Sequence, residues 1–132
     1  MLTYISTIDE IENEAGEIES FLTIVCSEDP NECTERGSQL AVYIARSGKL
    51  LADAKYHQDE AVQKSAIAEL GKSLKIAPSV LTKIISASTK RENYTVNRVE
   101  RLNRASVHQL DWMRTLISKA KEEMKFQGYV NH

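Results

Sequence analysis

Three arginines, Arg98, Arg101 and Arg104, stand three residues apart, and Lys90 and Arg91 precede them. A guanidinium group presents paired N–H donors that match two phosphate oxygens, so this cluster is suited to a phosphate-rich ligand. On a helix the three arginines fan over about 120° of the surface, which suits a bulky polyanion or a ligand held between subunits. The same residues would also serve as a solvated helix face. Both interpretations stay open for the cluster.

His108 is included in the predicted phosphate site because it lies one helical turn from Arg104 and from Asp111. Neutral hydrogen-bond donors stand nearby: Tyr94, Asn97 and Asn103. A solvated histidine on an ion-paired helix face is the simpler interpretation of His108. The arginines are not interleaved with aromatic residues, which counts against a protein that stacks single-stranded bases.

No pattern in the chain indicates catalysis. His57 and His108 have alanine three residues before them, so the Glu-x-x-His pairs of di-iron bundles are missing. Hydrolase, zinc-protease and phosphate-loop motifs are also missing. Cys26 and Cys33 flank a predicted turn. A disulfide is geometrically feasible there, but two free, partly buried thiols are favoured, and no second ligand pair suggests zinc. We therefore expect a protein that is not an enzyme and has no metal and no cofactor.

The elements that position these residues are predicted to be helices. Apolar and small residues recur at alternating spacings of three and four, which is typical of one buried helix face: Val99, Leu102, Ser106, Gln109, Met113, Leu116 and Ala120. Glycine and proline are scarce, so only a few long elements fit. The predicted helices are an acidic helix over 7–27, a long helix over 30–76, a short helix over 79–88 and a long helix over 89–126.

Helix boundaries follow from three capping sequences, which begin at Thr7, Asp29 and Thr89. Gly128 is predicted to stop the last helix in a left-handed conformation. The two long helices should form an antiparallel hairpin, with the acidic helix packed across it. If position 76 lies opposite position 89, Gln58 lies beside Val107 and forms a polar layer with Ser106 and Gln109. The expected fold is an elongated all-α helical bundle in a single domain.

A net charge of −2 conceals a strong polarity along the chain. Residues 1–36 contain ten acids and one base, whereas residues 72–104 contain eight bases and two acids. The overall acidity argues against a nucleic-acid coat protein, but the basic region remains a local cationic surface. The longest apolar run, 21–26, has an acidic flank and is too short for a signal peptide or a membrane span. We expect a cytoplasmic location and no membrane partner.

Self-association is predicted because so long a hairpin leaves more apolar stripe than one short helix covers. The expected state is a homo-oligomer, a dimer or a multiple of dimers. The predicted interface residues are Trp112, Met113 and Leu116, although Trp112 would equally shield the edge of an intramolecular core.

Residues 98–118 and the segment Leu51-Ala52-Asp53-Ala54-Lys55-Tyr56 resemble runs found in a family of small all-helical phage and prophage proteins. The resemblance covers about the last two thirds of the chain and implies phage origin and expression in the host cytoplasm. We expect a non-enzymatic phage-type protein that binds a nucleic acid or a nucleotide signal, with modulation of host defence as its role. The alternative is a helical scaffold or inhibitor that binds a host or phage protein, with the acidic helix as the contact.

Overall fold

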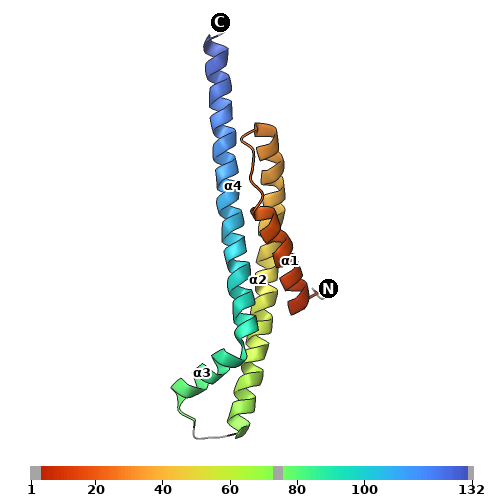
Figure 1. The fold of residues 1–132 in the computed structure, drawn as a ribbon, viewed down its shortest axis with the longest axis vertical. Coiled ribbons are helices and arrows are strands. Elements are labelled where there is room, and N and C mark those ends of the chain that lie inside the picture. Colours follow the sequence, from red (N-terminus) through yellow and green to blue (C-terminus); the bar gives the residue numbers. More distant parts are fainter. Residues whose placement is uncertain (1–3, 73–75, 131–132) are drawn as a thin grey trace.

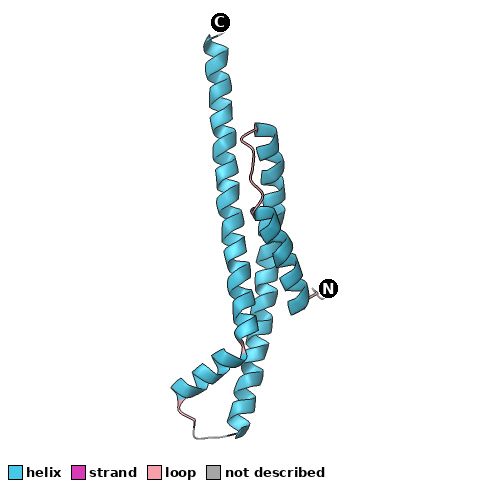
Figure 2. Ribbon diagram, in the orientation of Figure 1, coloured by secondary structure: helices cyan, strands magenta, loops and turns pink. Residues whose placement is uncertain are grey.

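Four α-helices make up nearly all of the structure. The computed structural model describes residues 4–72 and 76–130, and 88% of these residues are helical. In order, the helices are α1 (Ile8–Leu22), α2 (Pro30–Lys72), α3 (Pro78–Ser88) and α4 (Lys90–Val130). No strand occurs in the described ranges (Figure 2). The predicted all-α fold is therefore confirmed.

The two long helices, α2 and α4, run antiparallel and pack together along most of their length (Figure 1). Helix α1 lies across this hairpin and contacts both long helices. Helix α3 leaves the hairpin at an angle, and the C-terminal part of α4 projects beyond the start of α2 (Figure 1). None of the described helices is both long enough and apolar enough to span a membrane.

The larger of two buried clusters holds α1 against the hairpin. Ile11, Ala15 and Ile18 of α1 are at most 1% exposed, and they pack against Leu50 of α2 and Val99 of α4. Full burial of a side chain the size of isoleucine contributes about 1.5–3 kcal/mol. The apolar stripes predicted for 7–27 and 89–126 thus meet in one core.

A second cluster lies further toward the C-terminus of α4, where Cys33 and Leu40 of α2 pack against Met113 and Leu116. Phe21 at the end of α1 packs against this cluster, and the guanidinium of Arg36 lies 4.6 Å from the centre of the Phe21 ring. These contacts connect the end of α1 to both long helices.

Two of the three predicted helix caps form. The amide of Glu10 donates to the hydroxyl of Thr7, and the amide of Glu32 donates to the carboxylate of Asp29, each at 3.2 Å. The cap predicted at Thr89 is wrong. Thr89 is 1% exposed, and its hydroxyl instead donates to the carbonyl of Ile85 at 2.8 Å. Thr89 therefore caps the C-terminus of α3. Its buried hydroxyl needs a hydrogen-bond partner, and the carbonyl of Ile85 in α3 provides one.

Three predicted helix ends need correction. Helix α1 ends at Leu22 rather than at residue 27, because side chains take over its last carbonyls: Arg36 donates to Phe21 O, and Gln109 donates to Leu22 O at 2.9 Å. Val25 is consequently 93% exposed. Helix α2 is helical to Lys72, residues 73–75 lie outside the described residues, and residue 76 is not helical.

The stop predicted at Gly128 is also wrong. No described glycine has a positive φ, and α4 continues to Val130. No packed neighbour lies within 4 Å of the position that a Cβ of Gly128 would occupy, so nothing forces the chain to turn there. Glycine in a helix costs only about 1 kcal/mol relative to alanine.

The predicted pairing of the hairpin is wrong. Gln58 donates to Asn93 at 2.8 Å and is not beside Val107, and Asn103 donates to Ser47 at 2.8 Å. The partner of Gln58 thus lies fourteen residues earlier in the chain than predicted. Gln109 instead bonds the end of α1, so the expected layer of Gln58, Ser106 and Gln109 does not form. The shift arises because α3 diverges from α2, and α4 begins opposite the C-terminal third of α2 (Figure 1).

Candidate anion-binding groove

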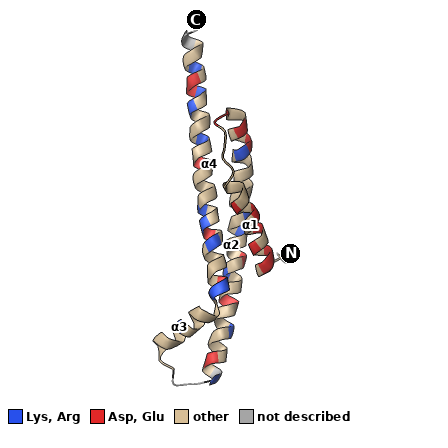
Figure 3. Ribbon diagram, viewed as in Figure 1, with Lys and Arg blue, Asp and Glu red and all other residues tan. Residues whose placement is uncertain are grey.

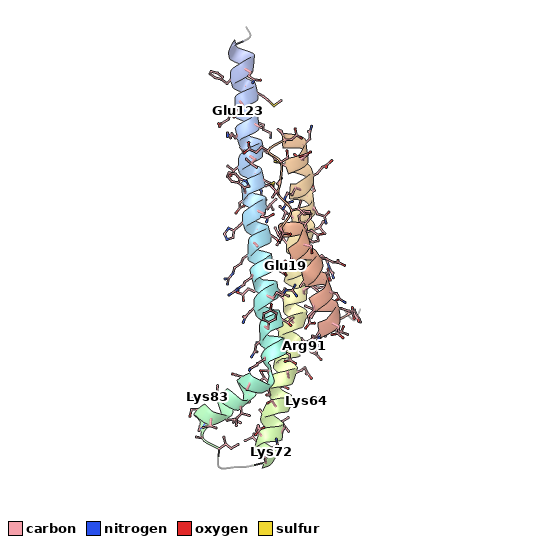
Figure 4. The ribbon with its side chains drawn as sticks, viewed as in Figure 1. Glu19, Lys64, Lys72, Lys83, Arg91 and Glu123 are labelled. Atoms are coloured by element: carbon pink, nitrogen blue, oxygen red, sulfur yellow. The ribbon has the colours of Figure 1, made fainter. Side chains whose placement is uncertain are left out.

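Two basic residues in the first part of α4, Arg91 and Arg98, face the acidic helix α1. Arg91 forms ion pairs with Asp9 and with Glu12, the latter at 2.7 Å, and Arg98 pairs with Glu19 at 2.6 Å. Figure 4 places Glu19 and Arg91 at two levels along the hairpin. The opposite charges of residues 1–36 and 72–104 are therefore joined within one chain, as the distribution in Figure 3 illustrates.

A further ion pair joins α1 to α2. Arg46 contacts both carboxylate oxygens of Glu14, at 2.6 and 2.7 Å. The hydrogen bonds that Arg46 donates to Glu14 raise the pKa of Arg46, and those that Glu12 accepts from Arg91 lower the pKa of Glu12. These side chains remain partly exposed to solvent, and ion pairs at the surface contribute only about 0–1 kcal/mol each. They orient α1, whereas its buried apolar face holds it in place.

The remaining residues of the predicted phosphate site have different surroundings. Arg104 pairs with Glu100 on its own helix at 2.6 Å. Lys90 and His108 are exposed. Arg101 is exposed and has no ion pair with any residue in the described part of the chain. The predicted cluster is thus divided: two arginines pair with α1, one pairs within α4, and Arg101 keeps its full charge toward solvent.

A shallow groove of about 680 Å³ runs along α4 beside the end of α1. Two of the predicted arginines line it, together with two of the predicted neutral donors and the acid that pairs with Arg98. The lining residues are Glu19, Tyr94, Asn97, Arg98, Arg101, Leu102 and Ala105. Its volume lies within the range of about 300–1,000 Å³ that small-molecule sites have.

The groove is lined by hydrogen-bond donors and by apolar side chains. Arg101 supplies an uncompensated positive charge, and Asn97 and Tyr94 add an amide and a hydroxyl. Leu102 is 9% exposed and forms part of the floor. Such a combination is suited to an anion whose remaining part is flat and apolar. It offers no nucleophile paired with a base, so it does not indicate catalysis.

The three residues predicted at a subunit interface differ in accessibility. Trp112 is 55% exposed, whereas Met113 is 2% and Leu116 is 7% exposed. Met113 and Leu116 pack within the second core cluster. Of the three, Trp112 is the one that reaches a partner without rearrangement of the core.

The sequence did not reveal a polar cluster that fixes the N-terminal segment to α2. Asp53, 8% exposed, accepts a hydrogen bond from the amide of Ser6 at 3.0 Å and forms an ion pair with Lys49. Lys49 also donates to Tyr4 O at 3.0 Å, and Nε2 of His57 lies 2.6 Å from Ser6 O. Lys49, Asp53 and His57 recur every four residues and therefore share one face of α2. The feature of the sequence that could have indicated this cluster is an acidic residue, Asp53, placed between the apolar residues Leu50 and Ala54.

His57 therefore has a structural partner, and a carbonyl acceptor requires that its Nε2 carries the proton. Both cysteines are free thiols, as expected. In the described ranges no group of three or more His, Cys, Asp or Glu side chains is placed to hold a metal ion.

Comparison of the chain with protein-family models, with curated proteins and with solved structures found no match. The arguments for function therefore start from the groove and from the exposed surfaces.

Proposed function

We propose that this chain is a non-enzymatic, phage-type binding protein that takes the phosphate of a nucleotide or nucleic acid in the α4 groove. The observation that carries the proposal is Arg101, an arginine without an acidic partner among the described residues, which lines a groove together with Arg98. A charged donor of this kind forms strong, directional hydrogen bonds to phosphate oxygens. Modulation of a host defence signal is the role that the phage resemblance suggests.

Glu19 acts in this proposal as an internal competitor of the ligand. It pairs with Arg98 at 2.6 Å and is itself 54% exposed. Because exposed ion pairs contribute little, an incoming phosphate exchanges with the carboxylate at a small cost in free energy. Arg98 then joins Arg101 in a two-arginine contact, while Asn97 and Tyr94 provide neutral donors.

Replacing Arg101 by alanine is expected to weaken binding of the phosphate ligand about tenfold or more, since a charged hydrogen bond contributes about 1.5–3 kcal/mol. Glu19→Gln should tighten binding by up to about fivefold, because the competing carboxylate is removed. Calorimetric titration with inorganic phosphate, cyclic nucleotides and short DNA and RNA measures both effects. Binding of DNA or RNA should also weaken steeply as salt rises.

Lys125→Ala is the matched control for this experiment, since Lys125 is an exposed cation on α4 far from the groove. Arg101→Ala should leave unfolding unchanged to within about 0.5 kcal/mol. Absence of heat with every ligand, or equal affinities of the Arg101 and Lys125 variants, would contradict the proposal.

A second candidate function, a scaffold that binds protein, is favoured by the apolar ends of the hairpin. Helix α3 has no buried residue, and Ile67 of α2 is 72% exposed. The projecting part of α4, on which Figure 4 labels Glu123, exposes Met124 at 67% and Phe126 at 70%. Since at least four acids of α1 already pair within the chain, these apolar ends replace the acidic helix as the proposed contact.

Light scattering at micromolar concentration is expected to give the mass of a dimer or of a multiple of dimers. The physical reason is that apolar side chains exposed on a projecting helix tend to be association sites. The double variant Met124→Ser with Phe126→Ser should shift the mass toward the monomer without loss of helix by circular dichroism. A monomeric wild type would exclude self-association through this surface.

A further inference from the structure

The connection between α1 and α2 runs beside α4 (Figure 1). Three sulfur-containing side chains gather in this region. The Sγ atom of Cys26 lies 3.5 Å from the Sδ atom of Met113. The thiols of Cys26 and Cys33 both donate to one carbonyl oxygen, that of Ser27, at 3.1 and 3.3 Å. The three side chains thus converge from two segments that are about 80–90 residues apart in sequence.

The position of this cluster is fixed by the core around it. Cys33 is fully buried and Met113 is 2% exposed, and both pack with Leu40 and Leu116. Cys26 is half-buried and provides the side from which solvent reaches the sulfurs. The cluster is therefore preorganised and accessible from one direction.

We propose that Cys26, Cys33 and Met113 form a binding site for Cu(I). Soft thiolate and thioether sulfurs select this ion over hard cations. Structural zinc and iron–sulfur sites take four ligands, commonly four cysteines or cysteines with histidines, and this cluster offers two thiols and a thioether. A disulfide between the two cysteines would give Met113 no role, whereas a soft metal ion uses all three sulfurs.

Binding of the ion is a ligand exchange without electron transfer. Two S–H bonds are lost, their protons pass to the solvent, and two Cu–S bonds form; Met113 contributes a sulfur lone pair and loses no proton. Burial, followed by the nearby Cys26 thiol, raises the pKa of Cys33, so the metal has to displace a firmly held proton. The bound ion would link the α1–α2 connection to α4, and it should therefore stabilise the fold.

The test is a competition experiment on the reduced protein under anaerobic conditions, with Cu(I) supplied as its bicinchoninate complex. We expect one Cu(I) per chain, three sulfur ligands by X-ray absorption, and a higher melting temperature for the loaded protein. Met113→Leu conserves volume in the core and should weaken Cu(I) binding at least about tenfold, the lower end of what even outer-sphere changes cost metal sites. Met124→Leu, an exposed methionine on the same helix, is the control and should bind as wild type does.

Cys33→Ser should abolish binding, and circular dichroism checks that this variant folds. If it does not fold, the comparison of Met113→Leu with Met124→Leu decides the question alone. Equal affinity of these two methionine variants overturns the proposal, as does a failure of the wild type to compete with bicinchoninate. Formation of a Cys26–Cys33 disulfide with oxidised glutathione, in a protein that takes up no Cu(I), would also overturn it.

Discussion

Replacing Ile18 by alanine is expected to lower the free energy of unfolding by about 2–5 kcal/mol. Ile18 is fully buried on α1, and it packs in the cluster that also contains Leu50 and Val99. Truncation removes the buried methyl groups and leaves a cavity that the helices on either side can fill only in part. Since domains are stable by only about 5–15 kcal/mol, this is a large fraction of the total.

Urea unfolding followed by circular dichroism measures this loss, and Val25→Ala is its matched control. Val25 lies in the same predicted helix, 7–27, but is 93% exposed, so its truncation should change stability by less than about 0.5 kcal/mol. Hydrogen exchange adds a local measurement: in the Ile18 variant the amides of α1 should exchange first, because the helix has lost part of the buried apolar face that holds it on the hairpin. Equal stability of the two variants would mean that α1 does not pack on the hairpin as described.

The number and type of the helices could be predicted from sequence because both signals are local. A three-and-four spacing identifies a buried face, and the caps at Thr7 and Asp29 are formed by residues three positions apart. The ends are less predictable, because they depend on distant residues. Helix α1 stops at Leu22 because the side chains of Arg36 and Gln109 donate hydrogen bonds to its last carbonyls. Neither residue is close to α1 in the sequence.

The pairing of the two long helices could not be obtained from the same signal. An apolar stripe that repeats about every seven residues matches its partner again after a slide of fourteen residues. That is the difference between the predicted partner of Gln58, Val107, and its observed partner, Asn93. Only specific polar contacts, such as that of Asn103 with Ser47, distinguish the two pairings.

Of the residues predicted for the phosphate site, Arg98 and Arg101 line the groove, and the sequence did not predict how their charges are paired. The spacing of Arg98, Arg101 and Arg104 correctly placed them away from the apolar stripe, but spacing does not reveal which arginine has an acidic partner. Arg98 pairs with Glu19 across 79 residues of sequence. The opposite charges of the two ends of the chain were the signal for such pairs, since a strongly acidic helix next to a basic one tends to dock on it.

The Asp53→Asn variant is expected to be less stable than the wild type by about 1–3 kcal/mol at neutral pH. The buried carboxylate of Asp53 accepts hydrogen bonds from the Ser6 amide and from Lys49, and both donors would keep at best a weaker, neutral acceptor. Their loss should free residues 4–7 from α2 and expose part of the cluster beneath them. Asp59→Asn, an exposed aspartate on the same helix, is the control and should have little effect.

The difference between wild type and Asp53→Asn should depend on pH in one direction. Burial raises the pKa of Asp53, but the hydrogen bonds from Lys49 and Ser6 outweigh it, so the folded pKa is lower than the ordinary value. A lowered folded pKa means that the carboxylate stabilises the fold fully above the pKa of an unfolded aspartate, about 3.9. This stabilisation is then lost as the pH falls through the folded pKa.

Urea unfolding of both proteins from pH 7 down to pH 3 tests this dependence. The gap in unfolding free energy should be constant near neutral pH and should begin to close below about pH 4, where the wild type starts to bind the proton that the asparagine variant cannot. Groups that keep the same surroundings in both proteins contribute equally and cancel in the difference. A gap that widens as the pH falls would mean that burial dominates at Asp53 and that its bonds to Ser6 and Lys49 do not hold the charged form.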